Sequence, residues 1–96
     1  MSEVEDEAVH LPPPSFHLLV YTMVERAALF LGLLRLQNQE EQPKPNLELA
    51  RHEIDMLAML QEKTKGNLTL EEQRYLENSL TELRFRYVQA TESQPA

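Results

Sequence analysis

Three polar residues in the segment 47–65 have a spacing that would suit a metal-binding or acid–base site on a helix. Glu48, His52 and Asp55 follow one another at steps of four and three residues, and such steps place side chains on one face of a helix. Carboxylate and imidazole groups can bind metal ions or exchange protons. However, the paired Glu-x-x-His motifs of di-iron bundles are absent, and the segment 70–89 contains no histidine. We therefore interpret the three residues as a solvated helix face and predict no metal ligand and no cofactor.

A second polar group lies in the most apolar part of the chain, the segment 16–36. His17, Tyr21 and Glu25 follow one another at steps of four residues and would share one face of a helix. A trio that handles protons is one interpretation. The pattern favours the other, a hydrogen-bonded polar seam inside an oligomer, because polar groups that become buried need hydrogen-bond partners.

Few other residues are candidates for chemistry. The chain has no cysteine, which excludes a disulfide scaffold, a thiolate metal site and a cysteine nucleophile. With only two glycines it has no glycine-rich phosphate-binding loop. Arg84, Phe85, Arg86 and Tyr87 form a basic–aromatic cluster, but basic residues near the C-terminal end of a helix are explained by the helix dipole. A formal net charge of −7 argues against a nucleic-acid-binding protein. We therefore predict no catalytic residue and a non-enzymatic protein.

The apolar segment 16–36 is the element around which the chain is organised. Ser15 follows the proline triplet Pro12–Pro14 and is expected to cap a helix over Phe16–Gln37. Pro43 prevents this helix from continuing. The helix is apolar around most of its circumference, and two shorter helices can hardly surround it. We therefore expect a homo-oligomer that associates through this helix.

Two small residues, Ala28 and Gly32, lie four positions apart in the expected helix. Glycine inside a helix is less favourable than alanine by about 1 kcal/mol, so its presence calls for a reason. One explanation is that a long buried helix tolerates it, in which case Gly32→Ala would stabilise the protein. The alternative is that the small residues allow another helix to approach closely, in which case Gly32→Leu would weaken association.

Two charges at the centre of the apolar segment bear on its relation to membranes. Glu25 and Arg26 would each cost about 2.5–3.5 kcal/mol at the middle of a bilayer, so a transmembrane helix is not expected. Residues 3–7 carry four acids where a signal peptide has basic residues. We expect a cytoplasmic protein. A helix that lies on a membrane surface is the alternative, and the scarcity of Lys and Arg weakens it.

Caps and apolar spacing predict two further helices. Asn46 is expected to cap a helix that ends just before Gly66, which would take a left-handed conformation. Thr69 and Glu72 match a capping box at the start of a helix that runs to Gln89. The predicted apolar face of the first is Leu47, Ala50, Ile54, Leu57 and Ala58, broadened by Leu49, Met56 and Leu60, and that of the second is Leu76, Leu80, Leu83 and Tyr87. The short connection between these helices predicts an antiparallel hairpin.

Several strings in the same region resemble a known family. They are PNLELA (45–50), IDML (54–57) and EKTKGNLT (62–69), together with PSF (14–16) and LTELR (80–84). Over roughly residues 14–88, the chain is similar to a family of short bacterial proteins catalogued as domain of unknown function eighteen forty-four. The resemblance implies an intact natural domain. It implies no activity, substrate or catalytic residue.

We therefore predict an all-α protein in which a long apolar helix packs on an antiparallel helical hairpin and self-association completes the core. Residues 15–90 would form the domain, between a disordered acidic, proline-rich tail (1–14) and a disordered tail (91–96). The function we expect is that of a non-enzymatic protein-interaction or oligomerisation module, whose partner is itself, with another protein as a further candidate. The alternatives are a membrane-surface helical protein and a small metal-binding protein or enzyme that uses Glu48, His52 and Asp55.

Overall fold

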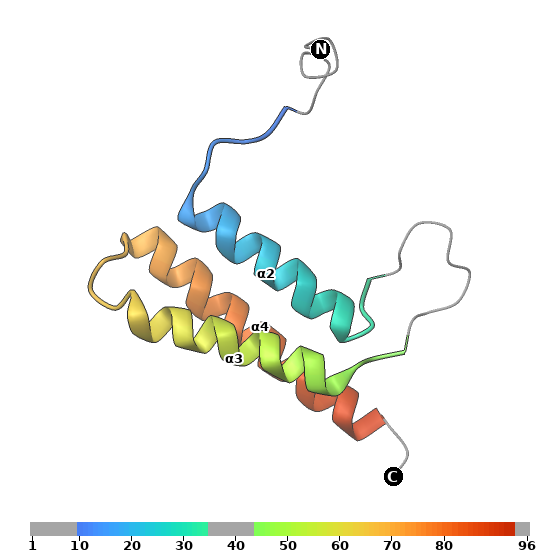
Figure 1. The fold of residues 1–96 in the computed structure, drawn as a ribbon. Coiled ribbons are helices and arrows are strands. Elements are labelled where there is room, and N and C mark those ends of the chain that lie inside the picture. The colour runs from blue at the N-terminus through green and yellow to red at the C-terminus, as the bar shows by residue number, and fades with distance from the viewer. Residues whose placement is uncertain (1–9, 35–43, 94–96) are drawn as a thin grey trace.

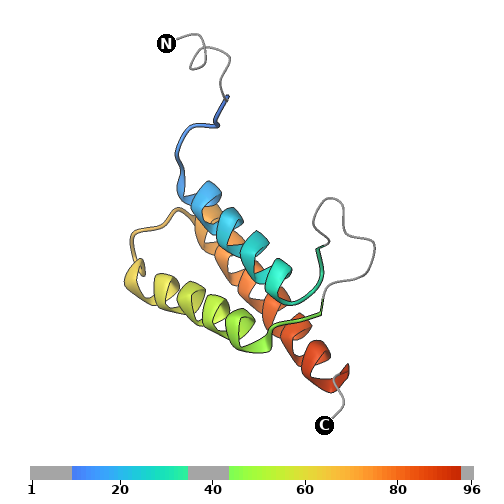
Figure 2. The same ribbon diagram turned by 45° about the vertical axis from the view of Figure 1, so that its right-hand side comes forward.

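The computed structural model describes residues 10–34 and 44–93, and over these ranges the chain forms three α-helices and no strand. They are α2 (Phe16–Phe30), α3 (Leu47–Lys63) and α4 (Leu70–Ser93), which pack against one another (Figure 1). The hairpin of α3 and α4 is antiparallel, and α2 runs in the same direction as α4 (Figure 2). The predicted all-α fold is therefore confirmed.

Each helix begins at the residue that the sequence predicts. The Ser15 hydroxyl accepts a hydrogen bond from the Leu18 N–H at 3.0 Å, and the Asn46 side chain accepts one from the Leu49 N–H at 3.1 Å. At α4, the Glu72 N–H donates to the Thr69 hydroxyl at 3.1 Å, while the Thr69 N–H donates to the Glu72 carboxylate at 2.9 Å. These bonds satisfy N–H groups that have no partner within the first turn of a helix.

The first helix ends at Phe30, whereas the sequence-based prediction extended it to Gln37, so that prediction is wrong. Gly32 has a φ of 78°, and its N–H donates to the Leu29 carbonyl at 3.0 Å. The Leu33 N–H donates to the Ala28 carbonyl at 2.9 Å. These two bonds form the Schellman motif that closes many helices, in which glycine supplies the left-handed residue.

Gly32 therefore lies after the helix and not inside it. Both explanations considered for an interior glycine, tolerance and close approach of another helix, are wrong, because its positive φ is the reason for the residue type. Residues 35–37 of the predicted helix lie outside the described ranges. Gly66 has a φ of 84°, as expected, although α3 ends at Lys63 with Thr64 as its C-cap.

The helix α4 extends further than predicted, to Ser93 and not Gln89, so residues 91–93 belong to the helix and not to the disordered tail predicted for 91–96. In its last turn the Thr91 and Ser93 hydroxyls donate to the carbonyls of Val88 and Gln89 at 2.7 and 2.8 Å. Residues 10–15 lie outside any helix and are exposed. The other parts of the two predicted tails, 1–9 and 94–96, lie outside the described ranges.

All three helices contribute to one core. Its buried apolar residues are Val20, Met23, Ala27 and Leu31 from α2 and its C-cap, Ala50, Ile54 and Leu57 from α3, and Leu76, Leu80 and Leu83 from α4. The central stripes predicted for the hairpin are buried, with Leu47, Ala58 and Tyr87 partly buried at their edges, but Leu49 and Met56, which were predicted to broaden the face of α3, are exposed. On α2, by contrast, Leu19 and Tyr21 stay roughly half exposed. The hairpin therefore covers only one side of the apolar helix.

Candidate functional site

The acid–histidine group on α3 is spread over the surface of the protein. Glu48, His52 and Asp55 are all exposed. In the part of the chain that the structure describes, no group of three or more His, Cys, Asp or Glu side chains could hold a metal ion. The structure therefore does not bring the three predicted candidates together as a binding site.

The polar group on α2 is divided between two contacts within the chain. The His17 ring stacks on the Tyr75 ring of α4, with centroids 4.0 Å apart and an angle of 23° between the planes. A hydrogen bond with Glu25 and the negative charge of that carboxylate raise the pKa of Tyr21 above its ordinary value of 10.0. A raised pKa keeps the phenol protonated at neutral pH, which is the opposite of what a tyrosine base requires.

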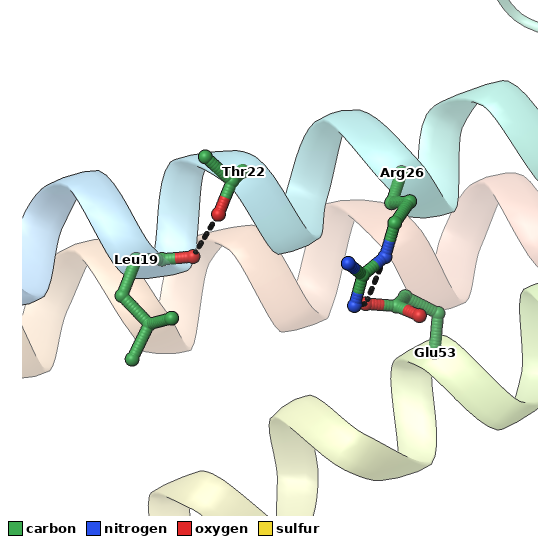
Figure 3. Close-up of polar contacts among 4 residues, drawn as sticks. All are labelled: Leu19, Thr22, Arg26 and Glu53. Carbon is green, nitrogen blue, oxygen red and sulfur yellow. Dashed lines mark hydrogen bonds and ion pairs between the residues drawn. The ribbon is translucent and has the colours of Figure 1, made fainter. Parts of the chain in front are cut away.

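An ion pair that the sequence patterns did not predict joins α2 to α3. Arg26 donates from Nε and Nη2 to the same oxygen of Glu53, Oε2, at 3.1 and 2.8 Å (Figure 3). The Glu53 side chain is only 6% exposed, whereas that of Arg26 is 56% exposed. A nearly buried carboxylate is thus held by a guanidinium that still reaches the surface.

The sequence contains a signal for this pair. Arg26 is the only Arg or Lys in α2, and Glu53 directly precedes Ile54 on the buried side of α3. A charge that is placed inside an apolar pattern needs an opposite charge nearby. The signal predicts that each residue has a partner, but it does not say which one, because the contact depends on how the two helices pack.

The ion pair lies at the centre of a surface that we call the α2–α3 face. It consists of Leu19, Thr22 and Arg26 on α2, and Leu49, Glu53, Met56 and Leu60 on α3. Steps of three and four residues place each set on one side of its helix, and the Arg26–Glu53 contact places the two sets next to each other. In Figure 3 the pair bridges α2 and α3, and Leu19 lies further along α2.

This face is mainly apolar and has no unpaired charge. Leu19, Leu49 and Met56 keep 47%, 45% and 37% of their surfaces exposed, and Leu60 is partly buried. The Thr22 hydroxyl donates to the Leu19 carbonyl at 2.8 Å, so its hydrogen bond is made within α2. The two charges of the face, on Arg26 and Glu53, are paired with each other.

The exposed apolar residues of α4 are arranged differently. Leu70 and Phe85 are exposed, but fifteen positions of helix separate them by about 22 Å. Exposed charged side chains, including Arg74 and Glu77, lie on the helix between them. The predicted pair of Glu82 and Arg86 is confirmed, with a distance of 2.8 Å. Val88, three positions after Phe85, is also exposed, so the outward side of α4 is a charged surface with one small apolar patch.

The described residues also form a shallow hollow at the turn between α3 and α4, with a volume of about 320 Å³. It is lined by Gln61, Glu62, Lys65, Gly66, Leu68, Gln73, Leu76 and Glu77. These side chains supply amides, carboxylates and an ammonium group, but no serine, threonine or cysteine nucleophile beside a base.

Comparisons with known proteins give one match. The model of the family described as Domain of unknown function (DUF1844) matches residues 13–89, which confirms the resemblance seen in the sequence. Neither the curated proteins nor the solved structures contain a match. In residues 10–34 and 44–93, none of the helices has the combined length and apolar character that crossing a membrane would require.

Proposed function

The chain belongs to the family described as Domain of unknown function (DUF1844), and we propose that it is a non-enzymatic interaction module whose partner is a second copy of itself. The observation that carries this proposal is the α2–α3 face. It gathers exposed apolar side chains from two helices around a charge pair that is already neutralised. Clusters of this kind mark surfaces that bind other proteins.

The exposed apolar area gives a scale for the association. Full burial of a leucine or methionine side chain contributes about 1.5–3 kcal/mol. Leu19, Leu49 and Met56 are each slightly less than half exposed, so covering them contributes about 2–4 kcal/mol per copy. Two copies therefore gain about 4–8 kcal/mol, while association itself costs at least about 4 kcal/mol. At most about 4 kcal/mol is left, which corresponds to a dissociation constant of about 1 mM, so the balance supports a weak dimer that dissociates on dilution.

A protein partner suits this face better than a membrane surface does. Helices that lie on membranes flank their apolar side with Lys and Arg, which attract anionic lipid headgroups. On α2 the one such residue, Arg26, is held by Glu53, and the chain as a whole carries a net charge of −7. The cytoplasm is the location that we propose, because a chain without cysteine has no thiol that depends on an oxidising compartment.

Light scattering after size-exclusion chromatography tests the proposal. We expect the mass to rise from 11.2 kDa toward twice that value as the loaded concentration increases from about 10 µM to above 1 mM. A mass of 11.2 kDa at every concentration would show that the protein does not self-associate. In a parallel flotation assay with anionic vesicles, the protein should stay with the soluble fraction, and flotation would favour the membrane-surface alternative.

A further inference from the structure

The charge pair also indicates how two copies are arranged, an inference that rests on the proposed function. We propose that the dimer is two-fold symmetric, that the α2–α3 face is its interface, and that α2 of each copy packs on α3 of the other. In this arrangement Arg26 of one copy lies opposite Glu53 of the second copy. The partner chemistry is therefore an apolar surface with one positive and one negative charge in fixed positions.

The net charge of the chain favours this face over the rest of the surface. Each copy carries −7, so two copies repel each other wherever acidic surfaces meet. The α2–α3 face is locally neutral, because its only charges are Arg26 and Glu53, which are paired at 2.8 Å. The outward side of α4 offers apolar residues as well, but it also carries Arg74 and Glu77 between them. A second copy therefore meets little repulsion at the α2–α3 face, together with exposed apolar side chains from two helices.

Two symmetric arrangements are possible when such faces meet. A two-fold axis in the interface plane and across the helices would place α2 on α2, so that the partly exposed Arg26 side chains of the two copies meet. An axis along the helices instead places α2 on α3, so that each Arg26 meets a Glu53. Like charges in contact are unfavourable and opposite charges are favourable. The positions of the two charges thus select the axis along the helices.

The apolar residues fit the same arrangement. Within one copy, Leu19 lies seven residues before Arg26, and Leu60 lies seven residues after Glu53. Because α2 and α3 are antiparallel (Figure 1), Leu19 and Leu60 lie at the same level along the bundle. An axis along the helices preserves this level, so that Leu19 of one copy faces Leu60 of the other. Apolar side chains then surround the central charges, as in interfaces where an arginine is shielded from water by its neighbours.

The size of the face sets the expected strength. Fifteen residues of α2 extend about 22 Å, and two helices packed at about 10 Å present a strip about 20 Å wide. The area of this strip, the product of its length and width, is smaller than the area of roughly 800 Å² that each partner buries in a stable complex of standard size. The interface is therefore expected to be at the weak end of the range, consistent with a dimer that dissociates on dilution.

Single cysteines test the arrangement, because the chain has none of its own. Thr22 on α2 lies four residues before Arg26, and Met56 on α3 lies three residues after Glu53, so the two lie at similar levels on the face. Thr22→Cys and Met56→Cys proteins are prepared with tags of different mass and treated with a bismaleimide crosslinker. Thr81→Cys, on an exposed part of α4, serves as the matched control.

If α2 packs on α3, the mixture of Thr22→Cys and Met56→Cys gives at least about fivefold more mixed dimer than either protein alone gives of its own dimer. Efficient crosslinking of Thr22→Cys with itself would show that α2 packs on α2 and would overturn the arrangement. Efficient crosslinking of Thr81→Cys with itself, without the mixed dimer, would place the interface on α4 and also overturn it. In both of these cases the proposed self-association would stand. It fails only if untreated wild-type protein stays monomeric in light scattering.

Discussion

Removal of the arginine from the Arg26–Glu53 pair should destabilise the folded monomer, and the structure allows the effect to be estimated. In Arg26→Met the apolar part of the side chain is largely kept, but the guanidinium is lost. The Glu53 carboxylate, 6% exposed, then loses the two hydrogen bonds at 2.8 and 3.1 Å that it accepts at Oε2. It cannot be solvated fully without a movement of α2 away from α3.

The typical contributions of a charged hydrogen bond and of a buried ion pair set the range expected for the loss of stability in Arg26→Met. A hydrogen bond to a charged group contributes about 1.5–3 kcal/mol, and breaking a fully buried ion pair by removing one partner costs about 3–5 kcal/mol. Because Arg26 is 56% exposed, water screens the pair and the lower part of this range applies. We expect Arg26→Met to lower the free energy of unfolding by about 2 kcal/mol. The double variant Arg26→Met/Glu53→Met should lose less, because no unpaired charge stays behind.

Urea denaturation followed by circular dichroism measures these differences. The samples are kept at about 1 µM, where the proposed dimer is dissociated and does not add to the stability. Glu82→Gln, which removes the exposed pair with Arg86, is the matched control and should change the free energy of unfolding by less than about 1 kcal/mol. If Arg26→Met is as stable as the wild type, the carboxylate of Glu53 is not desolvated and the reasoning is refuted.

Three further predictions follow from single residues. Gly32→Ala and Gly66→Ala should each lower the free energy of unfolding by about 1 kcal/mol, because both glycines have a positive φ; a gain in stability on urea denaturation would contradict the Schellman assignment of the first. Thr69→Ala should cost about 1 kcal/mol through loss of the capping bond, and an unchanged melting temperature would argue against that bond. The pKa of Tyr21 should lie above 10.0 and fall toward this value in Glu25→Gln, because the carboxylate favours the protonated phenol. The small contribution of the Tyr21–Glu25 hydrogen bond to the stability is present below pH 10.0 and is lost at higher pH. An ultraviolet titration of Tyr21 that is the same in Glu25→Gln and in the wild type would contradict this prediction.

The parts of the fold that depend on neighbouring residues could be predicted from the sequence. The caps at Ser15, Asn46 and Thr69 use side chains within three residues of the bonds they make. The stripes of the hairpin follow from a constant spacing along each helix. These features do not require knowledge of how the helices pack on one another.

The end of the first helix was mispredicted because two signals compete there. Gly32 has the residue type that commonly follows a helix, which was the argument used correctly for Gly66. The apolar residues Leu33 and Leu34, however, continue the pattern of α2 and favoured a longer helix. The backbone bond from the Asn46 N–H to the Phe30 carbonyl, at 2.7 Å, depends on the arrangement of α2 and α3 and could not be read from either segment alone.

The candidate site was predictable only in part. The excess of apolar residues on α2 indicated an uncovered surface, and Leu19 is part of it. The contribution of α3 was missed: Leu49 and Met56 were assigned to a broad buried face, but they are exposed beside the ion pair. Which side of α3 faces the core depends on the packing of three helices, and spacing along one helix does not determine it.

Sedimentation equilibrium on the wild type and one variant of the face tests the central claim most directly. At about 1 mM the mean mass of the wild type should lie well above its monomer mass of 11.2 kDa. Met56→Glu, which adds an unpaired charge to the α2–α3 face, should be a monomer with unchanged helical circular dichroism. Phe85→Glu, on the exposed side of α4, should dimerise like the wild type. A wild type that remains at 11.2 kDa, or a Met56→Glu protein that dimerises as strongly as the wild type, would contradict the account.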